Sequence, residues 1–270
     1  MASGLIDTAV SAARAGGEVL LANWRRLPQG SVEEKKKNDF VTFADRESEA
    51  RIVAAIRARF PDDAFLGEEG GTHGGGGAAA GARTWIIDPL DGTSNFVSGF
   101  PFWCVSIAAR EGDELVAAVI WDPLRDEMYT AEKGAGAWRN GTRLQVRVRP
   151  DINGAFLATG FPFRNVEKID TYLALFRAVF VRARAIRRAG SAALDLAFVA
   201  AGVFDGFFEF RLAPWDIAAG ALLIQEAGGV LTDFQGGSRY LERGNIVAGS
   251  AGVNASLRQV ARGIVDEQLL

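Results

Sequence analysis

Apolar residues change their spacing near residue 150 of this chain. Before that position they form short runs that are continuous or alternate with polar residues, which is typical of strands. The expected strands of this half cover residues 64–67, 85–88, 102–110, 115–121, 127–131 and 143–148. In the last of them, Leu144, Val146 and Val148 alternate with polar residues, as in a half-buried strand. Two amphipathic helices are expected before the strands, over residues 3–25 and 45–60.

Strand-like and helical segments alternate after residue 150. The expected strands cover residues 155–159, 205–210, 230–233 and 246–248, and the expected helices cover residues 168–181, 191–201, 216–227 and 251–269. Two of these helices are followed directly by glycine, at Gly202 and Gly228, which is a common way for a helix to end. We therefore expect a layered α/β (α+β) fold. It would have a mainly antiparallel α+β subdomain over residues 1–149 and an α/β subdomain over residues 150–270.

Composition narrows the class of protein. The chain has 270 residues, 49% of them hydrophobic and 23% charged, which fits a soluble globular protein rather than a disordered one. Its net charge of −3 provides no global basic field, so direct binding of nucleic acid is not expected. The single cysteine, Cys104, excludes an internal disulfide framework and fits a reducing compartment. The N-terminus resembles an amphipathic helix rather than a signal peptide, so we expect a cytoplasmic protein.

The most informative stretch of the chain is WIIDPLDGTSNF, residues 85–96. A hydrophobic strand there is expected to place Asp88 and Asp91 on a tight turn, and the backbone N–H groups of Gly92 and Thr93 are free to face an anion. Magnesium prefers hard oxygen ligands, some of which are often supplied by a substrate phosphate. The alternative is that proline, aspartate and glycine simply form a favourable turn.

Two further carboxylates occur where strands or loops meet helices. Glu68 follows a predicted strand, and Asp216 stands at a predicted helix start after Pro214. Taken singly, Glu68 fits a surface loop and Asp216 fits an N-cap. Taken together with Asp88 and Asp91, they provide oxygen ligands for two or more Mg²⁺ ions, as in sites where paired metals assist phosphoryl transfer.

These stretches resemble the inositol monophosphatase family, and within it the bacterial inositol-1-monophosphatases. The similarity is carried by WIIDPLDGTSNF together with GEE at residues 67–69, NDFVTFAD at 38–45, GSAALDLAFVAAG at 190–202 and WDIAAGALLIQEAGG at 215–229. The motifs are long and cover most of the chain, and the glycine-rich residues 70–81 fit least well. The resemblance implies an αβαβα sandwich of the inositol monophosphatase and fructose-1,6-bisphosphatase type.

The resemblance also implies a site with two or three Mg²⁺ ions, most of whose ligands lie in residues 1–149. Glu68, Asp88 and the carbonyl oxygen of Leu90 would hold one ion. Asp88, Asp91 and Asp216 would hold a second, and Glu68 would assist a third through water. Thr93 with Glu68 would orient and deprotonate the attacking water, so the implied catalytic residues are Glu68, Asp91 and Thr93.

The remaining implied contacts concern the substrate and the surroundings of the metals. Gly92 and Thr93 would bind the phosphate through their backbone N–H groups. The residues implied to contact the hydroxyls or the alcohol of the substrate are Ser191, Ala192, Glu209, Asp91 and Asp216. Lys35 and Asp45 match a lysine and an acid that support the metal site; Lys36 and Lys37 remain alternatives to Lys35.

The implied activity is Mg²⁺-dependent hydrolysis of myo-inositol 1-phosphate to inositol and phosphate by metal-activated water. Related families with the same metal core cleave fructose 1,6-bisphosphate, adenosine 3′,5′-bisphosphate or histidinol phosphate, and these substrates remain alternatives. A lithium-sensitive homodimer is also implied. Some bacterial relatives are associated with the transcription machinery, so an RNA polymerase or antitermination partner is a second possible role.

Other phosphatase chemistries receive less support. The segment CVSIAAR, which starts at Cys104, has the spacing of a cysteine phosphatase loop but alternates like a buried strand. Asp88 and Asp91 are separated by two residues, which does not match the Asp-x-Asp pattern of aspartyl-phosphate enzymes. The only histidine, His73, lies in residues 70–81, which we expect to form an exposed flexible loop.

Overall fold

The computed structural model describes residues 4–28, 30, 32–36, 39–74, 83–162 and 166–266. The elements of the first half are α1 (Leu5–Asn23), β1 (Val32–Lys36), β2 (Asp39–Thr42), α2 (Phe43–Arg57), β3 (Ala64–Gly67), β4 (Gly71–Gly74), β5 (Arg83–Asp91), α3 (Thr93–Ser98), β6 (Cys104–Glu111), β7 (Glu114–Asp122), β8 (Glu127–Glu132), β9 (Gly136–Arg139) and β10 (Thr142–Arg143). Those of the second half are β11 (Phe156–Thr159), a 3₁₀ turn (Val166–Lys168), α4 (Ile169–Phe180), β12 (Ala185–Arg187), α5 (Ala192–Ala200), β13 (Gly206–Glu209), α6 (Pro214–Glu226), β14 (Val230–Thr232), α7 (Tyr240–Arg243), β15 (Ile246–Gly249) and α8 (Ala251–Ala261).

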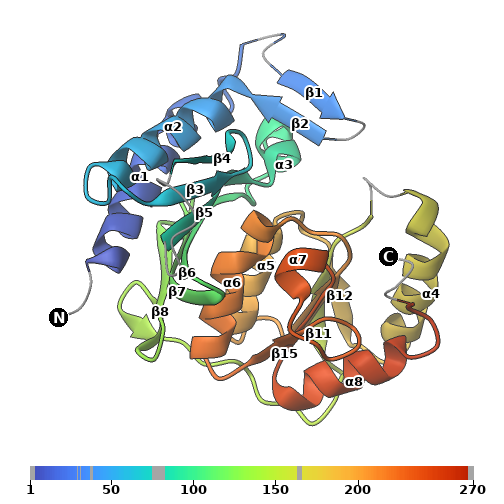
Figure 1. Cartoon of the computed structure of the whole chain (residues 1–270). Coiled ribbons are helices and arrows are strands. Elements are labelled where there is room, and N and C mark those ends of the chain that lie inside the picture. Colours follow the sequence, from blue (N-terminus) through green and yellow to red (C-terminus); the bar gives the residue numbers. More distant parts are fainter. Residues whose placement is uncertain are drawn as a thin grey trace.

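Helices and strands are stacked in alternating layers (Figure 1). Helices α1 and α2 pack on one face of an eight-stranded sheet of order β10-β9-β8-β7-β6-β5-β3-β4. Helices α5 and α6 lie between that sheet and a five-stranded sheet of order β12-β11-β13-β15-β14. Helix α8 packs on the other face of the smaller sheet, beside α4. The αβαβα sandwich implied by the resemblance is therefore confirmed.

The two sheets differ in strand direction. The larger sheet is antiparallel apart from the parallel pair β3 and β5. In the smaller sheet, β11 pairs in parallel with β12 and β13, whereas β15 pairs antiparallel with β13 and β14. Each sheet uses strands from one half of the chain, but the division into subdomains at residues 149 and 150 stays a prediction.

The middle helices are apolar over most of their surface, apart from Asp195 in α5 and the two ends of α6, because they lie between two sheets. Every residue of α5 except Phe198 is buried, and α6 is buried without interruption from Ile217 to Ile224. A helix that is apolar all round is expected only where no face meets water. Strand β5 is likewise buried continuously from Trp85 to Asp91, since helices cover both of its faces.

Several predicted boundaries are wrong for identifiable reasons. The strand expected over residues 143–148 stops at Arg143. Beyond it, the N–H of Val146 bonds to the carbonyl of Ala227 instead of a neighbouring strand, and the side chain of Val148 is 78% exposed. The final helix ends at Ala261, shortly before Gly263, whose φ of 81° does not fit a helix.

Three other expectations are also corrected. Helix α2 begins at Phe43 because Thr42 caps it, and it ends at Arg57 rather than at residue 60. Within the expected loop, Gly71–Gly74 form β4, which pairs with β3; residues 75–82 lie outside the described part. Asp88 and Asp91 belong to β5 and not to a separate turn. The strand expected over residues 64–67 is present with the same bounds as β3, and the remaining expected elements are present with shifted ends. Among the described residues, none of the helices combines the length and apolar character that a membrane crossing requires.

Close packing of α5 against α6 gives a stability prediction at Gly220. A methyl group on Gly220 would lie 2.4 Å from Cβ of Leu196, which cannot rotate away. A Gly→Ala change within a helix normally stabilises by about 0.5–1 kcal/mol, but overpacking a core costs about 1–3 kcal/mol. We expect Gly220→Ala to lower the free energy of unfolding, measured by urea denaturation. An unchanged or higher denaturation midpoint would contradict the close contact.

Candidate active site

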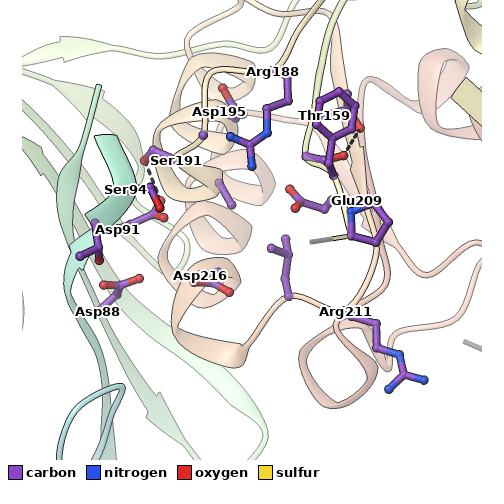
Figure 2. Close-up of a pocket in the computed structure, with 18 of the residues that line it drawn as sticks. Asp88, Asp91, Ser94, Thr159, Arg188, Ser191, Asp195, Glu209, Arg211 and Asp216 are labelled. Carbon is purple, nitrogen blue, oxygen red and sulfur yellow. Dashed lines mark hydrogen bonds between the residues drawn. The ribbon is translucent and has the colours of Figure 1, made fainter. Parts of the chain in front are cut away.

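A cavity of about 410 Å³ lies where the end of β5 faces the N-termini of α5 and α6 (Figure 2). The predicted site residues that line it are Glu68, Asp88, Leu90, Asp91, Gly92, Thr93, Ser191, Ala192, Glu209 and Asp216. The structure thus brings together side chains from both halves of the chain. Asp45 lies behind the cavity wall against Thr93. The side chain of Lys35 lies outside the described part of the structure.

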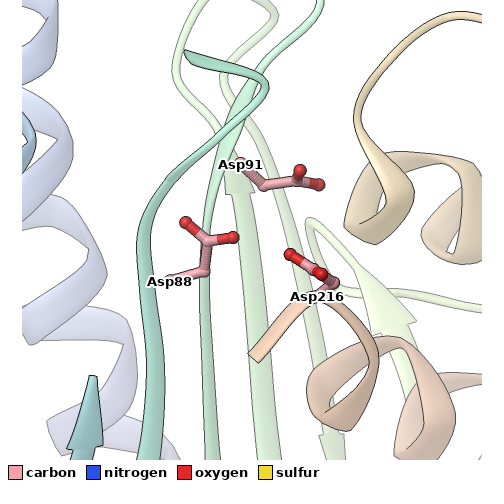
Figure 3. A group of neighbouring side chains, drawn as sticks. All are labelled: Asp88, Asp91 and Asp216. Carbon is pink, nitrogen blue, oxygen red and sulfur yellow. The ribbon is translucent and has the colours of Figure 1, made fainter. Parts of the chain in front are cut away.

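Three carboxylates converge on one wall of the cavity (Figure 3). One carboxylate oxygen from each of Asp88, Asp91 and Asp216 lies within 4.8 Å of the others. Asp88 is 1% exposed and Asp91 is 9% exposed. Burial, reinforced by the nearby carboxylates of Glu68, Asp91 and Asp216, raises the pKa of Asp88 well above its ordinary value. Such a cluster favours either a shared proton or a bound cation.

A β-bulge explains how two aspartates three residues apart face the same cavity. Asp88 pairs with Ser106 and Asp91 pairs with Cys104, so β5 contains one more residue than β6 between these pairs. In a regular strand, residues i and i+3 point to opposite faces. The extra residue reverses that alternation, and Pro89, which has no N–H to donate, lies within the bulge.

Asp216 is fixed by the start of helix α6. Pro214 occupies the first turn, where its missing N–H costs nothing. The Oδ2 atom of Asp216 accepts a 2.7 Å hydrogen bond from the N–H of Ala213. The positive end of the helix dipole also favours a negative charge at this position. The N-cap interpretation of Asp216 is therefore wrong: Ala213 is the N-cap of α6, and Asp216 is the third helical residue, whose carboxylate bonds back to the N-cap N–H and also belongs to the acidic cluster.

Asp45 contacts Thr93, the residue that the resemblance implies to act with Glu68 on the attacking water. Its Oδ2 atom accepts hydrogen bonds from the N–H and the hydroxyl of Thr42, at 3.0 and 2.6 Å. Its Oδ1 atom lies 3.2 Å from the hydroxyl of Thr93, which is also 3.1 Å from the carbonyl oxygen of Leu90. Burial raises the pKa of Asp45 to about 6. The pairing of Thr93 with Glu68 stays a prediction.

The opposite wall contains residues that sequence reasoning missed. Arg188 and Asp195 lie there beside Glu209 (Figure 2). Asp195 is 2% exposed, and its Oδ1 atom has no hydrogen-bond partner among the described residues. Burial, and then the charges of Glu209 and Asp91, raise the pKa of Asp195. The available signal in the sequence is that Asp195 is the only charged residue in the otherwise apolar helix α5.

The alternative chemistries are not supported by the structure. Cys104 is fully buried in β6, which confirms that CVSIAAR forms a strand. Burial raises the pKa of the Cys104 thiol, so the reactive thiolate is disfavoured. His73 lies in β4, where its ring stacks on Phe65 with 5.4 Å between ring centroids, and its side chain is only partly exposed.

The raised pKa of Asp45 predicts a change of stability with pH. Between its ordinary value of 3.8 and about 6, the folded protein binds more protons at Asp45 than the unfolded chain does. Stability therefore falls as pH rises through this interval, by roughly 3 kcal/mol in total. Asp45→Asn removes this loss, so the variant should gain stability relative to the wild type between about pH 4 and pH 7.

The measurement is urea denaturation of both proteins in chelator-treated buffer across this pH range. Asp113→Asn is the matched control, since Asp113 is exposed in the turn between β6 and β7. A constant difference between Asp45→Asn and the wild type at all pH values would contradict the burial of an ionising group.

Comparison with known proteins identifies the family. The model of the inositol monophosphatase family matches residues 1–266. Two proteins named Nus factor SuhB, from Pseudomonas aeruginosa and Escherichia coli K12, are 50% and 45% identical to the chain; each alignment covers 91% of both sequences. The crystal structure of extragenic suppressor protein suhB from Bartonella henselae has a TM-score of 0.92 at 38% identity, covering 97% of this chain and 100% of that one. The inositol monophosphatase from Anabaena (Nostoc) sp. PCC 7120 has a TM-score of 0.86 at 33% identity, covering 99% and 98%. The chain therefore belongs to the inositol monophosphatase family.

Proposed function

We propose that this protein is a Mg²⁺-dependent phosphomonoester hydrolase that converts myo-inositol 1-phosphate and water to inositol and phosphate. The observation that carries this proposal is the convergence of Asp88, Asp91 and Asp216 within 4.8 Å on the wall of a cavity. Membership of the inositol monophosphatase family supports the same reaction class.

The donor set fits a small, hard divalent cation. All three converging side chains are carboxylates, and their mutual repulsion is relieved when a cation lies between them. We propose that Glu68, Asp88 and the Leu90 carbonyl hold one Mg²⁺, and that Asp88, Asp91 and Asp216 hold a second. Glu68 would assist a third ion through water. Divalent cations bound there would neutralise phosphate charge and make water easier to deprotonate.

Residues at the start of α3 are suited to hold the phosphate and the attacking water. Gly92 has a φ of 98°, and a Cβ there would lie 3.0 Å from the carbonyl oxygen of Phe102, so only glycine fits. We propose that the N–H groups of Gly92 and Thr93 bind phosphate oxygens. The Thr93 hydroxyl would orient the attacking water, and Asp45 Oδ1 lies in position to accept the Thr93 proton. Glu68 would assist from its place in the cavity wall.

The other end of the cavity is suited to a polyol. Glu209 and Ala192 line it, and we propose that they contact the hydroxyl groups of the substrate. Asp91 and Asp216 would lie beside the alcohol that leaves. A cavity of about 410 Å³ lies within the range typical of small-molecule sites.

Fructose 1,6-bisphosphate, adenosine 3′,5′-bisphosphate and histidinol phosphate remain alternative substrates. A cytoplasmic homodimer and lithium sensitivity stay predictions from the resemblance.

Loss of one ligand should strongly lower turnover without unfolding the protein. We expect Asp91→Asn and Asp216→Asn each to lower kcat by at least about 100-fold at saturating Mg²⁺, because asparagine keeps the shape but not the charge of the ligand. The measurement is phosphate release from the four candidate substrates. Exposed Asp113→Asn is the control and should retain wild-type turnover. Near-wild-type turnover of either cavity variant would refute the ligand assignment, and a preferred substrate other than inositol 1-phosphate would correct the substrate.

A second candidate function is association with the transcription machinery. The relatives named Nus factor SuhB favour it, and we propose RNA polymerase or an antitermination factor as the partner. An interaction surface separate from the cavity would be insensitive to changes at the metal site. We therefore expect Asp88→Asn to retain partner binding while losing hydrolysis. A pull-down with the tagged chain, probed for RNA polymerase subunits, tests this. Absence of polymerase from the wild-type pull-down would count against the second role.

A further inference from the structure

The carboxylate of Asp91 is held on one side by the start of helix α5. Its Oδ2 atom accepts a 2.6 Å hydrogen bond from the hydroxyl of Ser191 and a 2.7 Å hydrogen bond from the N–H of Ala193. Both donors come from the other half of the chain, about 100 residues further on. Two hydrogen bonds to one oxygen restrict the rotation of a carboxylate.

Ser191 is not placed to serve a substrate hydroxyl as well. Its side chain is 1% exposed. Its single hydroxyl proton is directed to Asp91, and its oxygen accepts the N–H of Leu194 at 3.4 Å as the N-cap of α5. The Cys104 sulfur lies 3.7 Å away on the remaining side. Although Ser191 lines the cavity, its hydroxyl is therefore engaged by the protein itself.

Hydrogen bonds of Asn95 join the loop that contains Ser191 to the segment that contains Asp91. Asn95, in the first turn of α3, directs its amide nitrogen to the carbonyl oxygens of Ala189 at 2.9 Å and Phe102 at 2.6 Å. The Gly190 carbonyl lies 3.3 Å from the same nitrogen. Gly190 has a φ of 90°, and a Cβ there would lie 3.1 Å from that nitrogen. Asn95 thus sets the distance between the two segments.

We infer that Ser191, supported by Asn95, is a positioning residue for Asp91 rather than a substrate contact. Ser191 and the Ala193 N–H both bind Oδ2 and so fix the orientation in which the Asp91 carboxylate would meet the cation. This inference rests on the proposed metal site, and it replaces the hydroxyl contact that the family resemblance implies for Ser191. The orientation of Asp91, the proposed metal ligand on β5, then depends on the packing of α5 against β5.

The test measures the Mg²⁺ affinity of Ser191→Ala and of the wild type by calorimetric titration in the absence of substrate. Removing a group that orients a metal ligand typically weakens metal affinity by about 10- to 100-fold, and we expect a loss in that range.

The kinetics of Ser191→Ala provide a second readout. At saturating Mg²⁺, KM for inositol 1-phosphate should stay unchanged. The loss of kcat should be equal for inositol 1-phosphate and p-nitrophenyl phosphate, which has no polyol hydroxyl. Ser191→Thr retains the hydroxyl and should restore Mg²⁺ affinity.

A control separates this role from the loss of any buried serine hydroxyl at a helix start. Ser250 is also buried and occupies the N-cap position of α8, where its side chain makes no capping hydrogen bond; its hydroxyl bonds to the backbone of Arg149 at 3.2 Å and not to a carboxylate. Ser250→Ala should therefore retain Mg²⁺ affinity. If Ser191→Ala does not fold, Asn95→Asp provides the second variant, because it removes the amide donors and should weaken Mg²⁺ binding.

The possible outcomes are distinct. Unchanged Mg²⁺ affinity with a raised KM for inositol 1-phosphate alone would make Ser191 a substrate contact and overturn the inference. Unchanged affinity and kinetics would also overturn it. A wild-type protein that neither binds Mg²⁺ nor releases phosphate would overturn the proposed function itself, whatever the variants do.

Discussion

Crowding of buried negative charge at the end of β5 is the constraint on which the rest of the site depends. Three carboxylates within 4.8 Å repel one another in a poorly solvated place. Each carboxylate accepts a hydrogen bond from a backbone N–H. The N–H of Leu90 donates to Asp88 and that of Ala213 donates to Asp216, both within three residues, whereas the N–H of Ala193 donates to Asp91 from the other half of the chain. Backbone dipoles thus stabilise the cluster without filling its centre.

The layered architecture makes this convergence possible. Helices α5 and α6 lie between the two sheets, and both begin at the cavity, so two helix N-termini meet the end of β5. Small side chains allow this approach, most clearly at Gly220, where α6 contacts Leu196 of α5. The site is therefore a product of packing between the two halves of the chain as much as of the residues that line it.

Sequence reasoning predicted the long strands and helices because their apolar periodicity is local. It also selected residues that line one cavity, but through family resemblance, since spacing alone left Glu68 and Asp216 with ordinary explanations. It did not predict the bulge after Asp88, the contact of Asp45 with Thr93 or the end of the strand at Arg143. Each of these depends on a partner distant in sequence, such as Ala227 for the N–H of Val146. Asp195 was missed because an isolated aspartate in an apolar helix has no motif around it.

The buried thiol of Cys104 gives this protein an intrinsic reporter. It is the only cysteine of the chain and lies beside Ser191, between β6 and the start of α5. A thiol-specific reagent can reach it only when these segments separate, because the side chain is fully enclosed. The rate at which a single label is incorporated therefore reports how often the native molecule opens around Cys104. No engineered probe is required for that measurement.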